Sequence, residues 1–230
     1  MPQALLLIAD IGGYTDYMRM HRVGLAHAQV NTARLLEAVI DAVPDLELIE
    51  IEGDAAFMSS PQVDDLAANT AADAAVTMHR AFHAEQQRMV AANLCSCKGC
   101  VAVGLLRLKC VAHVGEVAEQ KIRDRRKLVG VDVILVHRML KNSVPVDEYL
   151  LLSEDLYGSC DSAIRNRASA VDEDLEGIGR VRAYFVDLDD VAKPLAPALK
   201  PTVRARVAET LRTISGGAPY VMGLRKLHRH

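Results

Sequence analysis

Two aspartates at the ends of predicted strands are the side chains best placed for chemistry in this sequence. Asp10 ends the apolar run at residues 4–9, and Asp54 follows Gly53 after the alternating segment 46–51. Burying a carboxylate at such a position is costly unless a cation meets it. Two carboxylates in matching contexts therefore indicate one shared metal site, although each aspartate would also serve as a simple helix or turn cap.

Three cysteines form a second group with possible chemistry. Cys95, Cys97 and Cys100 follow a predicted helix that carries His83 one turn after another histidine. Three thiolates with one imidazole, for which His83 is the candidate, or with a further cysteine, would complete a tetrahedral zinc site. Redox-sensing thiols and unliganded cysteines packed as small hydrophobic residues are the alternatives.

The composition bounds the class of protein. The chain has 230 residues, half of them hydrophobic, which is enough for one sizeable core. Its 27 basic and 30 acidic residues give a net charge of -3, which offers no general reason to bind nucleic acid or an anionic membrane. The N-terminal apolar run is too short for a signal peptide or a membrane span, and the 5 cysteines do not resemble a secreted disulfide framework. We therefore expect a cytoplasmic protein.

Hydrophobic periodicity predicts strands alternating with helices. The expected elements are a central strand at 4–10, a helix at 15–43, a hairpin at 46–58, a helix at 64–94, a strand at 103–117, a charged loop at 119–126, a short strand at 127–129, a helix at 131–141, and strands at 149–152 and 183–188. This order indicates an α+β fold, with helices packed on one face of a mixed sheet. We expect one domain over residues 1–190, then a linker and a basic C-terminal tail over residues 191–230, with a short helix at 203–214.

Four motifs carry a resemblance to a known superfamily. They are Asp-Ile-Gly-Gly-Tyr-Thr at 10–15, Gly-Asp at 53–54, His-Val-Gly-Glu-Val at 113–117, and Gly130 leading to Arg138. Together they resemble the catalytic domains of class III nucleotide cyclases, over about residues 4–188. Within that superfamily the chain is most similar to an uncharacterised bacterial family of unknown function, with which it shares residues 130–138 and the cysteine cluster. The resemblance implies a ferredoxin-like cyclase fold with a mostly antiparallel sheet, and a homodimer.

The resemblance also implies roles for individual residues. In these domains a ribose 3′-hydroxyl attacks the α-phosphorus of a nucleoside triphosphate, with divalent ions at the nucleophile and the phosphates. Asp10, Asp54 and the carbonyl of Ile11 match the ligands of Mg2+ or Mn2+. Arg138 matches the arginine that stabilises the transition state from the other subunit. The phosphates would lie along the backbone of four residues, Gly12, Gly13, Tyr14 and Thr15.

Two further positions bear on the choice of base. Glu50 stands where guanylate cyclases carry glutamate and adenylate cyclases carry lysine, and Lys127 occupies the second base-reading position. A carboxylate accepts from guanine N1–H and N2–H, and an ammonium donates to guanine O6. GTP is therefore favoured over ATP, unless Glu50 is only a solvated strand residue.

Two departures from the cyclase pattern leave the activity open. Ile134 replaces the asparagine that orients the ribose, and Glu176 replaces the lysine that binds the triphosphate. A carboxylate repels a triphosphate. The sequence is compatible with a cyclase, with a degenerate cyclase-fold module that binds a ligand without chemistry, or with a metal-sensing or redox-sensing protein centred on the cysteines.

Overall fold

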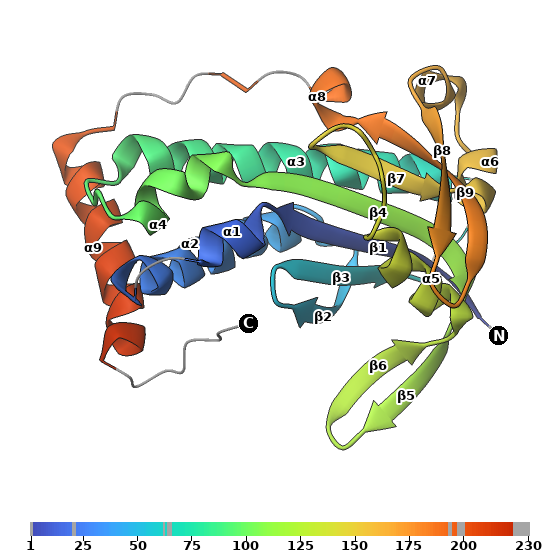
Figure 1. Ribbon diagram of the computed structural model, residues 1–230, viewed down its shortest axis with the longest axis horizontal. Helices are drawn as coiled ribbons and strands as arrows, with labels where there is room; N and C mark the ends of the chain where they lie inside the picture. Colours follow the sequence, from blue (N-terminus) through green and yellow to red (C-terminus); the bar gives the residue numbers. More distant parts are fainter. Residues whose placement is uncertain are drawn as a thin grey trace.

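The computed structural model describes residues 2–19, 22–61, 63, 66–192, 195–196 and 201–222, without the side chains of residues 22, 23 and 220. Within them, the main sheet has the strand order β2-β3-β1-β4-β7-β9-β8 (Figure 1). Its strands are, in chain order, β1 (Gln3–Gly12), β2 (Glu47–Glu52), β3 (Ala55–Ser60), β4 (Arg107–Glu116), β7 (Tyr149–Ser153), β8 (Ser169–Leu175) and β9 (Gly179–Asp187).

Strand pairing confirms the expected fold class. Neighbouring strands run antiparallel except β4 and β7, which pair in parallel. A separate two-stranded hairpin, β5 (Ala118–Ile122) with β6 (Arg125–Val129), projects from one end of the sheet (Figure 1). The fold is therefore a mixed, mostly antiparallel α+β sheet with packed helices.

Two long helices, α2 (Arg22–Asp41) and α3 (Ala67–Ala92), cover the same face of the sheet (Figure 1). The helix expected at 15–43 is divided, because Arg19 leaves the helical conformation after the first short helix. The shorter elements are α1 (Tyr14–Met18), α4 (Lys98–Val101), the 3-10 turn η1 (Ala102–Leu105), α5 (Val131–Met139), α6 (Glu154–Gly158), α7 (Ser162–Arg165) and α8 (Leu188–Val191). Among the described helices, none is long and apolar enough to cross a bilayer.

The central strand β1 separates two hydrophobic cores. Odd-numbered residues such as Leu7 belong to the larger core, with α2 and α3. Even-numbered residues such as Leu6 point to the other face and pack with the short helix α5. Because side chains alternate along a strand, Asp10 lies on the α5 face, in register with Lys109 of β4.

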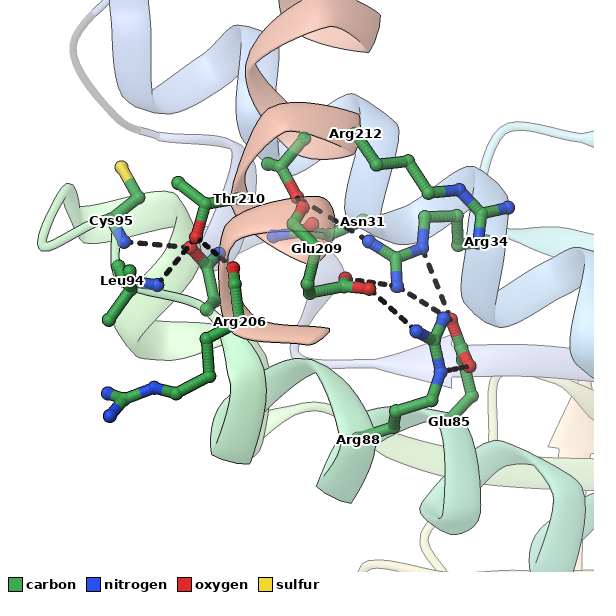
Figure 2. Close-up of polar contacts among 12 residues, drawn as sticks. Asn31, Arg34, Glu85, Arg88, Leu94, Cys95, Arg206, Glu209, Thr210 and Arg212 are labelled. Carbon is green, nitrogen blue, oxygen red and sulfur yellow. Dashed lines mark hydrogen bonds and ion pairs between the residues drawn. The ribbon is translucent and has the colours of Figure 1, made fainter. Parts of the chain in front are cut away.

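The C-terminal segment contributes a further helix, α9 (Val203–Val221), which lies across α2 and α3 (Figure 1). Glu209 of α9 points between two guanidinium groups, with ion pairs of 2.5 Å to Arg34 and 2.6 Å to Arg88 (Figure 2). Glu85 of α3 also pairs with both arginines. The segment 203–221, which its composition assigns to a tail, is therefore docked on the main domain. The basic sequence after residue 222 lies outside the described residues.

Candidate functional site

The two aspartates meet at one end of the central strands. Asp54 occupies the β2–β3 turn, which is held against β1 by a 3.2 Å hydrogen bond from the Ile11 amide to the Asp54 carbonyl. Burial raises the pKa of Asp54 to about 7, and the charge of Asp10 contributes to the increase. Burial also raises the pKa of Asp10, against the opposing effect of Lys109. A cation beside this pair would relieve both the desolvation and the repulsion.

The segment after Ile11 gives the aspartates their immediate surroundings. A Cβ at Gly12 would lie 3.0 Å from Cε of Lys109, so glycine leaves space for the lysine beside Asp10. Gly13 has a φ of 81°, in the left-handed region that glycine adopts without strain, and it precedes α1. Burial and the nearby charge of Asp54 raise the pKa of Tyr14. The next residue, Thr15, is exposed.

The two predicted base-reading residues are in contact. Nζ of Lys127 on β6 lies 3.0 Å from Oε2 of Glu50 on β2. The Glu50 side chain is 26% exposed. The Glu50 carboxylate, an acceptor, and the Lys127 ammonium, a donor, are distant in the sequence but lie side by side where β6 contacts the edge strand β2.

The predicted transition-state arginine is bound to the residue that departs from the cyclase pattern. Nη1 of Arg138 lies 2.6 Å from Oε2 of Glu176, in the turn between β8 and β9. Ile134 lies one turn earlier on α5 and is 52% exposed. The exposed face of α5 therefore carries an apolar side chain, followed by an arginine that a carboxylate of the same chain neutralises.

The cysteine cluster contains a different histidine from the one expected. The Sγ atoms of Cys95, Cys97 and Cys100 lie 3.6, 3.3 and 3.5 Å from Nδ1 of His27 on α2. All four ligand atoms lie within 4.8 Å of one another, and the thiols are free. The structure therefore corrects the choice of His83: the imidazole beside these thiols belongs to His27.

The cluster is partly sheltered from solvent: His27 and Cys100 are buried, and Cys95 and Cys97 are half-buried. Burial lowers the pKa of His27, which favours the neutral imidazole that metals bind. Burial, with a smaller effect of the neighbouring Cys97, raises the pKa of the Cys100 thiol. This environment differs from the electropositive, exposed surroundings that make a cysteine reactive.

His83 belongs to a buried ion-pair network. Its Nε2 lies 2.9 Å from Oε1 of Glu148, and its Nδ1 lies 3.0 Å from Oε1 of Gln86. The Gln86 amide is fixed by its own hydrogen bonds to Val103 and Leu106 carbonyls, so both nitrogens of His83 face acceptors. Burial alone would lower the pKa of His83, but the contact with Glu148 raises it.

Glu148, just before β7, links α3 and β4 through its carboxylate. It accepts hydrogen bonds from Nε2 of His83 on α3, at 2.9 Å, and from the Leu108 amide of β4, at 2.7 Å, and Nε2 of His79 lies 3.5 Å from its Oε2. Burial opposes ionisation, yet these contacts lower the pKa of Glu148 to about 2. His79, His83 and Glu148 form a second group of potential metal ligands, in which His83 and the Glu148 carboxylate are already hydrogen-bonded to each other.

Sequence reasoning missed three residues of these sites. His27 is far along the chain from the cysteines, so no ligand spacing connects them. Glu148 follows Asp147 just before β7 and belongs to no recognised motif. Lys109 was detectable as a charge within an apolar strand, a pattern that indicates a buried or paired group.

Comparison with known sequences assigns the chain to a family. It belongs to the family described as "Protein of unknown function (DUF2652)", whose model matches residues 32–149. It is 42% identical over 159 residues to the uncharacterized protein Rv2561/Rv2562 of Mycobacterium tuberculosis, a match that covers 68% of this chain and 73% of the relative.

Comparison with solved structures identifies the fold. The adenylyl cyclase CyaB from P. aeruginosa is similar with a TM-score of 0.60 and 16% identity, over 86% of this chain and 97% of that one. The guanylyl cyclase Cya2 has a TM-score of 0.59 and 17% identity, over 80% and 91% of the two chains. The guanylate cyclase domain of RhGC from Catenaria anguillulae, solved with GTP, has a TM-score of 0.54 and 15% identity, over 80% and 96%. The chain thus has the fold of class III cyclase domains.

Proposed function

We propose that this protein, as a homodimer, binds a purine nucleoside triphosphate together with Mg2+ or Mn2+ and prefers GTP to ATP. The observation that carries this proposal is the meeting of Asp10 and Asp54 beside β1. Two adjacent carboxylates supply the hard oxygen ligands that these cations prefer. Because the charges of Asp10 and Asp54 repel each other, a cation bound between the two carboxylates would be stabilised.

The residues around the pair fit such a ligand. Asp10, Asp54 and the carbonyl of Ile11 would hold the metal, and the backbone of Gly12 and Gly13 would approach the phosphates closely. When bound, the ions would neutralise phosphate charge and favour ionisation of the ribose hydroxyl. Lys109, in register with Asp10, adds a second cation on the same face of the sheet.

The contact between Glu50 and Lys127 supports the preference for guanine. The 3.0 Å ion pair holds a carboxylate and an ammonium side by side before any base is present. Guanine offers two N–H donors to the carboxylate and O6 to the ammonium, whereas adenine has no donor at N1. Adenine, with no donor at N1, would leave the Glu50 carboxylate paired with Lys127 alone.

Cyclisation of the bound nucleotide is the second candidate, favoured by Arg138 at the position of the transition-state arginine. The 3′-hydroxyl would lose its proton to solvent, and its oxygen would bond to the α-phosphorus as the bond to the bridging oxygen breaks and pyrophosphate leaves. Arg138 of the partner subunit would stabilise the developing charge. The ion pair with Glu176 and the apolar Ile134 oppose this candidate, and they favour binding without turnover.

Calorimetric titration of the full chain with GTP and ATP, with and without Mn2+, tests the proposal. We expect Mn2+-dependent binding that Asp54→Asn removes and that Asp45→Asn, an exposed control in the preceding loop, leaves intact. Mass spectrometry of the same mixtures detects any cyclic product, and sedimentation velocity gives the oligomeric state. Absence of metal-dependent binding by either triphosphate overturns the proposal.

A second variant pair tests the choice of base. We expect Glu50→Gln to reduce the ratio of GTP to ATP affinity about tenfold, the effect of losing a charged hydrogen-bond acceptor. Glu37→Gln, on the exposed face of α2, is the control and leaves the ratio unchanged. An unchanged ratio in Glu50→Gln would remove Glu50 from base recognition.

A further inference from the structure

We propose that Cys95, Cys97, Cys100 and His27 form a closed Zn2+ site that fixes the segment between α3 and α4 on α2 and supports the docking of α9. This site lies outside the aspartate pair, and it does not depend on nucleotide binding.

The distances within the cluster match tetrahedral coordination. With Zn–S bonds of about 2.3 Å and a Zn–N bond of about 2.0 Å, a tetrahedron separates sulfur from nitrogen by about 3.5 Å. The three Sγ atoms lie 3.6, 3.3 and 3.5 Å from Nδ1 of His27. One imidazole nitrogen takes part in a single hydrogen bond, so hydrogen bonding does not explain three thiols converging on it.

The ligand types indicate which metal would bind. Three thiolates and an imidazole select a borderline-soft ion such as Zn2+ over Mg2+ or Ca2+, which prefer oxygen. Four protein ligands complete the tetrahedron and leave no position for water or substrate, as in structural zinc sites. The expected role is therefore structural rather than catalytic.

The ligands come from a rigid part of the fold. A Cβ at Gly99 would lie 2.4 Å from the carbonyl oxygen of Gly24, so α4 and α2 touch through glycine. The Gly99 carbonyl accepts hydrogen bonds from Tyr17 Oη at 2.5 Å and from Asn31 Nδ2 at 3.2 Å. These contacts hold the backbone between Cys97 and Cys100 in place beside His27, a preorganisation typical of metal sites.

The other edge of the His27 ring faces α9. A Cβ at Gly217 would lie 2.7 Å from Cδ2 and 3.3 Å from Nε2 of His27. The absence of a side chain at Gly217 therefore leaves space for the His27 ring where α9 crosses α2. Near the other end of the cluster, the Leu94 amide donates to Thr210 Oγ1 on α9 at 2.9 Å (Figure 2). A metal bound through Nδ1 would fix the ring against which α9 packs.

Metal analysis of the full chain tests the proposal. Protein purified under reducing conditions, without added metal, is examined by native mass spectrometry and by elemental analysis. We expect one zinc per chain, and about a tenfold or greater loss of zinc in His27→Ala and in Cys97→Ser. His83→Gln and Cys160→Ala are the matched controls, since neither residue lies in the cluster, and they keep the zinc.

Two measurements on the unaltered protein keep the proposal falsifiable if the variants fail to fold. Replacement of zinc by Co2+ should give the visible spectrum of a tetrahedral cobalt–thiolate centre. Removal of the metal by a chelator should accelerate hydrogen exchange in residues 203–221 and 95–101, with much less effect in β1. A chain without zinc and without a cobalt–thiolate spectrum, or zinc lost in His83→Gln and kept in His27→Ala, would overturn the proposal.

Discussion

Nη1 of Arg138 and Oε2 of Glu176 are 2.6 Å apart, so the cation assigned to phosphate chemistry is neutralised by a carboxylate of its own chain. Both side chains are partly or largely exposed, which limits the strength of the pair. A phosphate group would compete with Glu176 for the same guanidinium. By competing for Arg138, Glu176 would therefore reduce the affinity for a nucleotide or the rate of its turnover.

We predict that Glu176→Gln strengthens Mn2+-dependent nucleotide binding about fivefold, because it frees Arg138 and removes a repulsive charge. An exposed ion pair contributes up to about 1 kcal/mol, which corresponds to this change. Calorimetry measures the affinities. Asp174→Asn, an exposed carboxylate on the same β8–β9 hairpin, is the control. Equal affinities for wild type and Glu176→Gln would mean that Arg138 does not contact the nucleotide.

The aspartate pair should destabilise the metal-free protein at high pH. The folded protein raises the pKa of Asp54 from 3.8 to about 7, so the penalty is absent below the unfolded pKa and grows as pH rises toward 7. We predict that Asp54→Asn, without metal, unfolds at a higher temperature than wild type at pH 8, with a stability gain of about 1 kcal/mol or more that vanishes near pH 4. Added Mn2+ should stabilise only the wild type. Differential scanning calorimetry at both pH values measures the unfolding temperatures. The same difference between Asp54→Asn and wild type at pH 4 and at pH 8 would refute the prediction.

The buried carboxylate of Glu148 should govern stability at acid pH. Its pKa of about 2 means that its contribution is present above the unfolded value of 4.5 and is lost as pH falls toward 2. The raised pKa of His83 has the opposite dependence: its contribution is present below 6.5 and is lost as pH rises through the folded pKa. We predict that Glu148→Gln lowers the free energy of unfolding by about 3 kcal/mol between pH 4.5 and 6.5, where both contributions are present.

Urea unfolding across the pH range measures this loss. Glu37→Gln, exposed on α2, is expected to change stability by less than about 0.5 kcal/mol. A pH-independent loss in Glu148→Gln would contradict the ion-pair interpretation and leave only packing.

The docking of α9 should depend on one charge. Glu209 is 4% exposed and lies between Arg34 and Arg88, and Arg34 is itself 5% exposed. We predict that Glu209→Gln costs about 2 kcal/mol and increases protease cleavage before α9, because a buried guanidinium loses part of its neutralisation. Glu119→Gln breaks an exposed ion pair with Arg126 and should cost less than about 1 kcal/mol. Equal costs for the two variants would show that burial adds nothing to the Glu209 contacts.

The parts of the fold with strong periodicity were predictable from the sequence. The continuous apolar run of β1 indicated a central strand, and the long helical patterns of α2 and α3 indicated helices on the same face. The edge strand β8 was not predicted, because most of its side chains are exposed and Glu173 interrupts the apolar alternation of Val171 and Leu175. Most of the β5–β6 hairpin was interpreted as a charged loop, because most of its side chains are also exposed.

The candidate sites were predictable only where local motifs exist. Asp10 lies two residues before Gly12, Asp54 directly follows Gly53, and the three cysteines are close in sequence. His27 was not predicted, because only the packing of α4 on α2 brings it to the thiols. The contact of Arg138 with Glu176 likewise depends on how the β8–β9 turn reaches α5.

The pairing of Arg34 with Glu209 also orders events during translation. The ribosome makes Arg34 early, whereas its most buried partner belongs to the last described helix. A nascent chain that has already collapsed around β1 would hold this guanidinium with Glu85 alone until residue 209 emerges. Final consolidation of the interior therefore waits until residue 209 has been made, and chains truncated before it should be more exposed to chaperones and proteases than their folded sheet alone would suggest.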